Sequence, residues 1–204
     1  MRKFAPLLII LGFIALAGFW YINIKNGALG VSQAVSKEWG NVETAYQRRN
    51  DLIGNLVKTV QGAADFEKST LEAVINARAK ATSVTIDPTN ITPDQLQQFQ
   101  QAQGGLNSAL SRLLVSVERY PDLKANQNFL KLQDELASTE NQILTARTRF
   151  NEKVEIYNNY ILRIPNNWFL AEYKEKPYFE AEKGAEKPVE VEFDFGNKEK
   201  EAAE

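Results

Sequence analysis

Two adjacent guanidinium groups, a carboxylate and an amide come together in one short segment of this 204-residue chain, at Arg48, Arg49, Asp51 and Asn55. Guanidinium groups bind carboxylates through paired hydrogen bonds, so the segment is suited to an anionic ligand or a partner's acidic side chain. The same residues also suit a fold in which a buried arginine paired with a carboxylate fixes helix register. We favour this structural interpretation, and we extend it to the segment Thr139-Glu140-Asn141.

Catalytic chemistry is limited by composition, because the sequence contains neither cysteine nor histidine. Their absence removes thiol nucleophiles, imidazole acid–base catalysis, serine–histidine triads and nearly all zinc and transition-metal sites. The carboxylates of Glu152 and Glu155 are similar to pairs in the metal sites of helical bundles, but those sites add a histidine to each pair. We therefore expect no enzyme activity, no catalytic or metal-binding residue and no cofactor.

The arginine-rich segment lies within a helix predicted from about residue 31 to about residue 82. Apolar or small residues recur there in alternating steps of four and three, as in a helix packed lengthwise against partners. They are Val35, Trp39, Val42, Tyr46, Ile53, Leu56, Val60 and Ala63. Arg49 falls where this repeat requires an apolar residue, so its guanidinium either points into the core or reaches out past its neighbours.

Two further helices complete an all-α fold, an antiparallel up-and-down bundle of three long helices within residues 31–165. The second, 93–119, has a strong start signal, with Thr92 as the cap, Pro93 at the first helical position and Gln95 three residues after the cap. The third covers 127–164. The charge balance of 24 basic and 26 acidic residues gives no basic field for nucleic acid.

A turn between residues 83 and 91 would place the arginine-rich segment opposite the corner that joins the second and third helices. Arg49 would then face Asn126. The predicted polar cluster comprises Arg48, Arg49, Asp51, Asn55, Glu118, Tyr120, Asp122 and Asn126.

The same register leaves residues 31–48 beyond the reach of the other two helices. Their apolar face is a candidate interaction seam, formed by Val35, Trp39, Val42 and Tyr46. Either the C-terminal tail returns to cover this seam, or the seam binds a second copy or a partner helix.

The N-terminus has the pattern of a membrane anchor. Residues 1–3 are a short basic start, and residues 4–24 contain no charged residue over a length sufficient to cross a bilayer. Arg2 and Lys3 before this run favour a cytoplasmic N-terminus and a periplasmic or extracellular remainder. The alternative is a cleaved signal peptide. Residues 25–30, with two glycines, are predicted to be a linker, although a helix continuous with the anchor is the other solution.

The C-terminal tail, 166–204, is first aromatic and then acidic. We expect its aromatic side chains to dock on the bundle or on the membrane surface, and they include Trp168, Phe169, Tyr173, Tyr178 and Phe179. Residues 188–195 alternate as in a strand that adds to the edge of another chain or stays disordered, and 197–204 are predicted to be disordered.

These features resemble the LemA family of bacterial membrane-anchored proteins. The resemblance rests on a single N-terminal span followed, in order, by the strings WGNVETAYQRRNDLIGNLVKTV, LSRLLVSVERYPDLKANQNF and PYFEAE. It covers nearly all of the domain outside the span. It implies an antiparallel bundle of three or four helices outside the anchor, and it suggests links to envelope integrity, membrane remodelling and membrane proteases of the HtpX type.

We interpret the chain as a non-enzymatic scaffold or adaptor in the bacterial inner membrane. It would interact through its membrane-proximal helix with itself or with another membrane protein. The alternative is a periplasmic ligand-sensing or regulatory subunit of an HtpX-type membrane protease. A hydrolase is a third hypothesis, for which the sequence shows no nucleophile–base pair.

Overall fold

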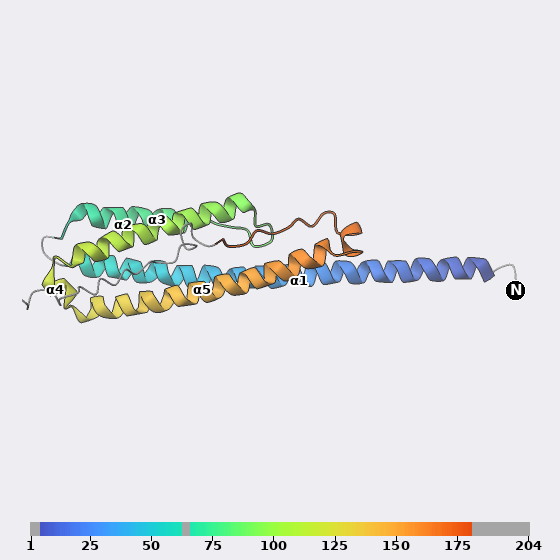
Figure 1. Cartoon of the computed structure of the whole chain (residues 1–204), viewed down its shortest axis with the longest axis horizontal. Coiled ribbons are helices and arrows are strands. Elements are labelled where there is room, and N and C mark those ends of the chain that lie inside the picture. The colour runs from blue at the N-terminus through green and yellow to red at the C-terminus, as the bar shows by residue number, and fades with distance from the viewer. Residues whose placement is uncertain (1–4, 63–65, 181–204) are drawn as a thin grey trace, which may run out of the picture.

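The computed structural model describes residues 5–62 and 66–180, and every regular element in these residues is helical (Figure 1). The all-α class predicted from the sequence is therefore confirmed. The elements are α1 (Ala5–Gln61), α2 (Lys68–Ser83), α3 (Pro93–Val117), α4 (Pro121–Lys124), α5 (Gln127–Leu162) and the 3₁₀ turn η1 (Asn166–Trp168). The strand-like segment 188–195 and the end 197–204 lie outside the described residues.

Helix α1 runs without interruption from the apolar N-terminus into the bundle. The predicted linker at residues 25–30 is therefore wrong, and the continuous helix is the solution that the chain adopts. Gly27 has a packing role there, because the ring of Tyr160 on α5 occupies the space where a Cβ atom would lie. The Tyr160 hydroxyl donates a hydrogen bond to the Ile24 carbonyl at 3.1 Å. The glycine thus permits a close approach of two helices.

Replacing Gly27 with alanine is expected to displace Tyr160 and weaken the contact between α1 and α5. The matched control is Gly30→Ala, because nothing lies within 4 Å of a Cβ atom at Gly30. Glycine inside a helix costs about 0.5–1 kcal/mol relative to alanine, so the control should stabilise the protein by that amount. Urea unfolding of the full chain in detergent micelles should give shifts of opposite sign. Equal stabilisation by both variants would contradict the packing role of Gly27.

The predicted helix over residues 31–82 is in fact two helices. The chain reverses between the end of α1 at Gln61 and the start of α2 at Lys68. Helix α2 then packs back on α1, where the Arg78 Nε donates a hydrogen bond to the Asn50 carbonyl at 2.7 Å. The apolar repeat hid this reversal, because both helices carry core residues at similar spacing.

The beginnings of α3 and α5 follow from local side-chain chemistry. The predicted capping box at the start of α3 is confirmed, since Thr92 and Gln95 bond each other's backbone N–H groups. At the start of α5, the side-chain oxygen of Asn126 accepts hydrogen bonds from the backbone N–H groups of Asn128 and Phe129 at 2.9 and 3.2 Å. Such caps satisfy donors that the first helical turn leaves unpaired.

The long helices α1 and α5 form an antiparallel pair, and the hairpin of α2 and α3 packs beside them (Figure 1). Two hydrophobic clusters fill the interior. The proximal cluster, nearer the apolar N-terminal part of α1, includes Trp39, Phe99 and Phe150, and the distal cluster includes Ile53 and Leu113. The end of α1 that precedes these clusters projects alone.

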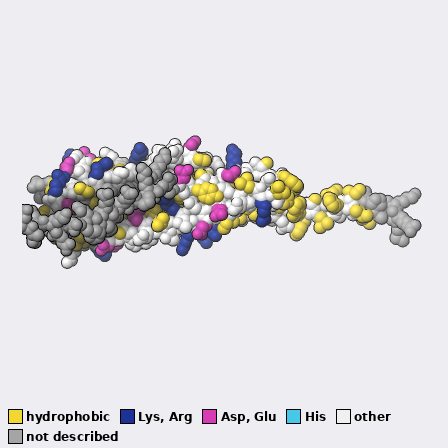
Figure 2. All heavy atoms as spheres, in the orientation of Figure 1, with side chains coloured by type: hydrophobic (Ala, Val, Ile, Leu, Met, Phe, Trp, Pro, Cys, Tyr) yellow, Lys and Arg dark blue, Asp and Glu magenta, His cyan; other side chains and the backbone are white. Residues whose placement is uncertain are grey.

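The projecting part of α1 is apolar and exposed. Side chains from Leu8 to Phe19 lie outside the bundle, and Figure 2 shows this end as a narrow hydrophobic extension. Among the described residues, α1 is the one helix that is long and apolar enough to cross a membrane.

Candidate functional site

A polar layer crosses the bundle and separates its two hydrophobic clusters. It contains Arg49 on α1, Gln103 on α3 and Thr139 on α5, all of which are buried. Along each of these helices, core residues of the proximal cluster lie on one side of the layer and core residues of the distal cluster on the other. Of the two orientations predicted for Arg49, the structure adopts the one that points into the core.

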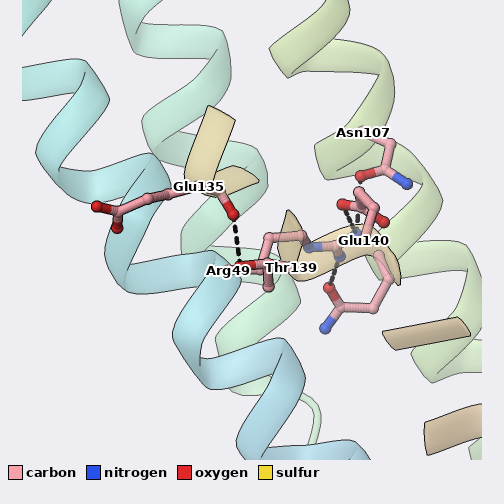
Figure 3. Close-up of polar contacts among 6 residues, drawn as sticks. Arg49, Asn107, Glu135, Thr139 and Glu140 are labelled. Carbon is pink, nitrogen blue, oxygen red and sulfur yellow. Dashed lines mark hydrogen bonds and ion pairs between the residues drawn. The ribbon is translucent and has the colours of Figure 1, made fainter. Parts of the chain in front are cut away.

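Hydrogen bonds from the Arg49 guanidinium join α1 to α3 and α5 in this layer, whereas the Thr139 hydroxyl donates to the Glu135 carbonyl of its own helix (Figure 3). The Arg49 Nη1 donates to the Asn107 Oδ1 at 2.9 Å and to the Glu140 Oε1 at 3.1 Å, and its Nη2 donates to the Gln103 Oε1. Gln103 in turn donates from Nε2 to the Ala81 carbonyl of α2 at 3.4 Å. The layer therefore connects α1, α2, α3 and α5 at one level of the bundle.

The charge of Arg49 is compensated within the chain. Its side chain is 1% exposed, whereas that of its partner Glu140 is 46% exposed, so the carboxylate reaches the solvent. The guanidinium also lies 4.8 Å from the centre of the Tyr46 ring, a cation–π contact. Its Nε has no hydrogen-bond partner among the described residues. A cavity of about 80 Å³ lies beside the guanidinium, with room for a few water molecules.

The predicted cluster between the arginine-rich segment and the α3–α5 corner is wrong as a spatial group, and Arg49 is its one member in the polar layer. Asp51 lies 3.8 Å from Arg78, and Glu118 pairs with Lys124. The prediction failed because the chain reverses between α1 and α2, which shifts the register of every later helix along α1. The remaining members lie outside the polar layer: Arg48 and Asn55 are exposed on α1, Tyr120 packs against Phe66, Asp122 is exposed on α4, and Asn126 caps α5.

The candidate interaction seam is not an exposed interaction surface, because its side chains are buried inside the protein. Val35, Trp39, Val42 and Tyr46 are each less than 9% exposed. The Trp39 ring contacts Phe99, Phe150 and Phe179, with centroid distances of 5.4, 5.6 and 6.0 Å. Helices α3 and α5 cover the seam together with the tail. The prediction that the other helices do not reach residues 31–48 is therefore wrong, and the tail contributes the cover that one of the two alternatives assigned to it.

Two asparagines on α5 hold the tail in place. Neither was among the residues predicted to be functional. The Asn158 side chain both donates to and accepts from the backbone of Lys176, at 2.9 Å each. Asn151 pairs with the backbone of Phe179 in the same way, at 3.0 and 2.9 Å. Seven residues of helix rise about 10.5 Å, and three extended residues span about 10 Å, so the two spacings match. The repeated asparagine at this spacing was the available signal.

Removing both asparagine amides should release the tail from α5. Each side chain satisfies one backbone N–H and one C=O, and a neutral hydrogen bond contributes about 0.5–1.5 kcal/mol. In Asn151→Ala/Asn158→Ala, we expect the backbone amides of Lys176 and Phe179 to exchange with deuterium at least about tenfold faster. Asn159→Ala is the matched control, since Asn159 is exposed. Unchanged exchange in the double variant would show that the aromatic contacts alone hold the tail.

Lys176 is a buried cation at the edge of this tail. Burial lowers the pKa of its amine below the usual 10.5, an effect that the carboxylate of Asp87 partly offsets. The Nζ donates to the Thr89 carbonyl at 2.8 Å and lies 5.4 Å from the centre of the Tyr157 ring. Hydrogen bonds from the hydroxyl and the backbone N–H of Thr89 lower the pKa of Asp87. These contacts tie the tail to the loop between α2 and α3.

This bundle combines a projecting apolar helix, a buried arginine layer and a docked aromatic tail. The family model for the LemA family matches residues 38–193, which is most of the chain. The chain belongs to the LemA family. Among the described residues of this LemA-family chain, no group of three or more acidic side chains is arranged to hold a metal ion.

Curated relatives agree with this assignment. The chain is 26% identical over 183 residues to magnetosome protein MamQ 2 of Paramagnetospirillum magneticum, which covers 80% of this chain and 67% of the relative. It is 25% identical over 162 residues to protein LemA of Metamycoplasma hominis, with 79% and 70% covered. The match to magnetosome protein MamQ of Magnetospirillum gryphiswaldense is 26% over 168 residues, with 73% and 62% covered.

Proposed function

We propose that this LemA-family chain is a non-enzymatic scaffold or adaptor of the bacterial cell envelope. Its α1 would cross the inner membrane with the N-terminus in the cytoplasm and the bundle on the periplasmic or outer side. The observation that carries the proposal is the continuity of α1, which couples the bundle to the apolar span through one helix. A partner held by the bundle would therefore be held at a defined position relative to the membrane.

The contact surface cannot be the buried seam, so we place it on the opposite, open face of the same helix. Gln33, Lys37, Asn41, Thr44 and Arg48 are exposed there at helical spacing. Where this face meets α5, a shallow groove of about 450 Å³ is lined mainly by small or polar side chains. They include Asn41, Thr44, Ser138, Asn141 and Thr145. Small side chains allow a second helix to approach closely, which suits a second copy or a partner membrane protein.

The regulatory alternative needs a ligand site or a protease contact. The cavity beside Arg49 is too small for more than a few water molecules, which argues against ligand sensing at this position. An HtpX-type protease would instead have to engage the groove between α1 and α5.

Photo-crosslinking from Thr44 in the full-length chain, in its native membrane, tests the scaffold proposal. Adducts at multiples of the chain's own mass would support self-assembly, and one discrete membrane-protein adduct would support an adaptor. A protease in that adduct would favour the regulatory alternative. Arg112, which is exposed on α3, is the control position. Absence of adducts from Thr44, or equal adducts from both positions, would contradict an interface in the groove.

A further inference from the structure

The turn that follows α5 lies against the last part of the apolar run of α1. The Phe169 ring contacts Trp20 and Tyr21, with centroid distances of 5.8 and 6.0 Å. Glu172 pairs with Lys25, the first charged residue after the apolar run. Because a helix rises about 1.5 Å per residue, Trp20 is about 6 Å inside the end of that run at Ile24. Phe169 is therefore level with the span.

The outward side of this turn carries large apolar side chains without cover. Ile164 is 68% exposed, Trp168 is 70% exposed and Leu162 is 51% exposed. Figure 2 shows hydrophobic side chains gathered where the projecting helix leaves the bundle. Arg163, also exposed, adds a positive charge among them. Tryptophan is enriched where a bilayer meets water, and cationic side chains suit anionic lipid headgroups there.

We propose that residues 162–169 form a second membrane contact, seated in the headgroup region of the bilayer beside Trp20 and Tyr21. The inference rests on the proposed membrane crossing by α1. With the apolar run crossing the bilayer, its last turn, from Trp20 to Ile24, lies at the boundary between hydrocarbon and headgroups. Phe169 lies at that depth, and the neighbouring Trp168 faces lipid. The bundle then touches the bilayer at two places, the span and the turn. Two contacts restrict its tilt and its rotation about α1, which a single helix leaves free.

The three tryptophans of the chain, Trp20, Trp39 and Trp168, allow a direct test. The full-length protein is reconstituted in phosphatidylcholine vesicles whose acyl chains are brominated near the headgroup, and its fluorescence is compared with that in unbrominated vesicles. Trp20→Phe leaves Trp168 as the reporter, and Trp168→Phe leaves Trp20. The double variant leaves the buried Trp39 as the baseline. We expect both single variants to lose emission in brominated vesicles, and the double variant to lose little.

The experiment distinguishes failure of the second membrane contact from failure of the proposed membrane crossing. Quenching of Trp20 with no quenching of Trp168 would overturn the second contact and leave the membrane crossing intact. No quenching of Trp20 would contradict the crossing itself, and with it the inference. Aqueous iodide gives the converse measurement, since a lipid-facing Trp168 should resist it. Strong iodide quenching in Trp20→Phe would place the turn in water and overturn the proposal.

Discussion

Truncating Trp39 to alanine should destabilise the bundle by about 3–5 kcal/mol, the usual cost of removing a large aromatic side chain from a core. Trp39 is 1% exposed and contacts aromatic rings from α3, α5 and the tail, so one truncation removes contacts to three segments. The measurement is urea unfolding of the full chain in detergent micelles, followed by circular dichroism.

Two further variants make this result specific. Trp39→Phe should cost less than Trp39→Ala, because it keeps a ring and removes an indole N–H that has no hydrogen-bond partner among the described residues. Trp168→Ala should change the stability in micelles by no more than about 0.5 kcal/mol, since Trp168 is largely exposed. A Trp39→Ala protein with unchanged stability but altered self-association would contradict the buried seam and restore the seam as an interface.

Replacing Gln103 with leucine should destabilise the protein by about 2–3 kcal/mol when Arg49 is present. The substitution removes the acceptor of the Arg49 Nη2 and leaves part of a buried charge without a partner. In an Arg49→Met background the same substitution should cost about 1 kcal/mol or less, because no charge then requires the acceptor. Arg49→Met alone should cost about 1–3 kcal/mol, because it leaves the buried Gln103 Oε1 without its donor.

The double-mutant cycle reports the coupling between these two side chains. Additive effects of Gln103→Leu and Arg49→Met would show that Arg49 does not depend on Gln103. Arg48→Met is the control for loss of a positive charge, because Arg48 is the exposed neighbour of Arg49. Its effect on the free energy of unfolding should remain within about 0.5 kcal/mol.

Features that depend on neighbouring residues were predicted well. The apolar repeat identified the core face of α1, including Trp39, because helical periodicity follows from backbone geometry alone. The cap of α3 was correct because Thr92, Pro93 and Gln95 act within a single turn. The unusual position of Arg49 was also visible, since a charged residue interrupted an otherwise apolar face.

Contacts that depend on where the chain reverses its direction were not predicted. The apolar repeat continues past the reversal between α1 and α2, so the helix appeared to extend to residue 82. That one error moved the expected partner of Arg49 from Gln103 and Glu140 to Asn126. It also left the seam uncovered, although Phe150 and Phe179 in fact pack against Trp39.

From the sequence alone it follows that the chain is helical, that its helices have apolar faces and that an apolar span precedes the bundle. These properties arise from side chains within a few turns of one another. The folded arrangement was needed to show which helices meet, that Arg49 lies in a polar layer and that Asn151 and Asn158 hold the tail. Such contacts join residues far apart in the chain. Which residues face each other depends on the position of every turn between them.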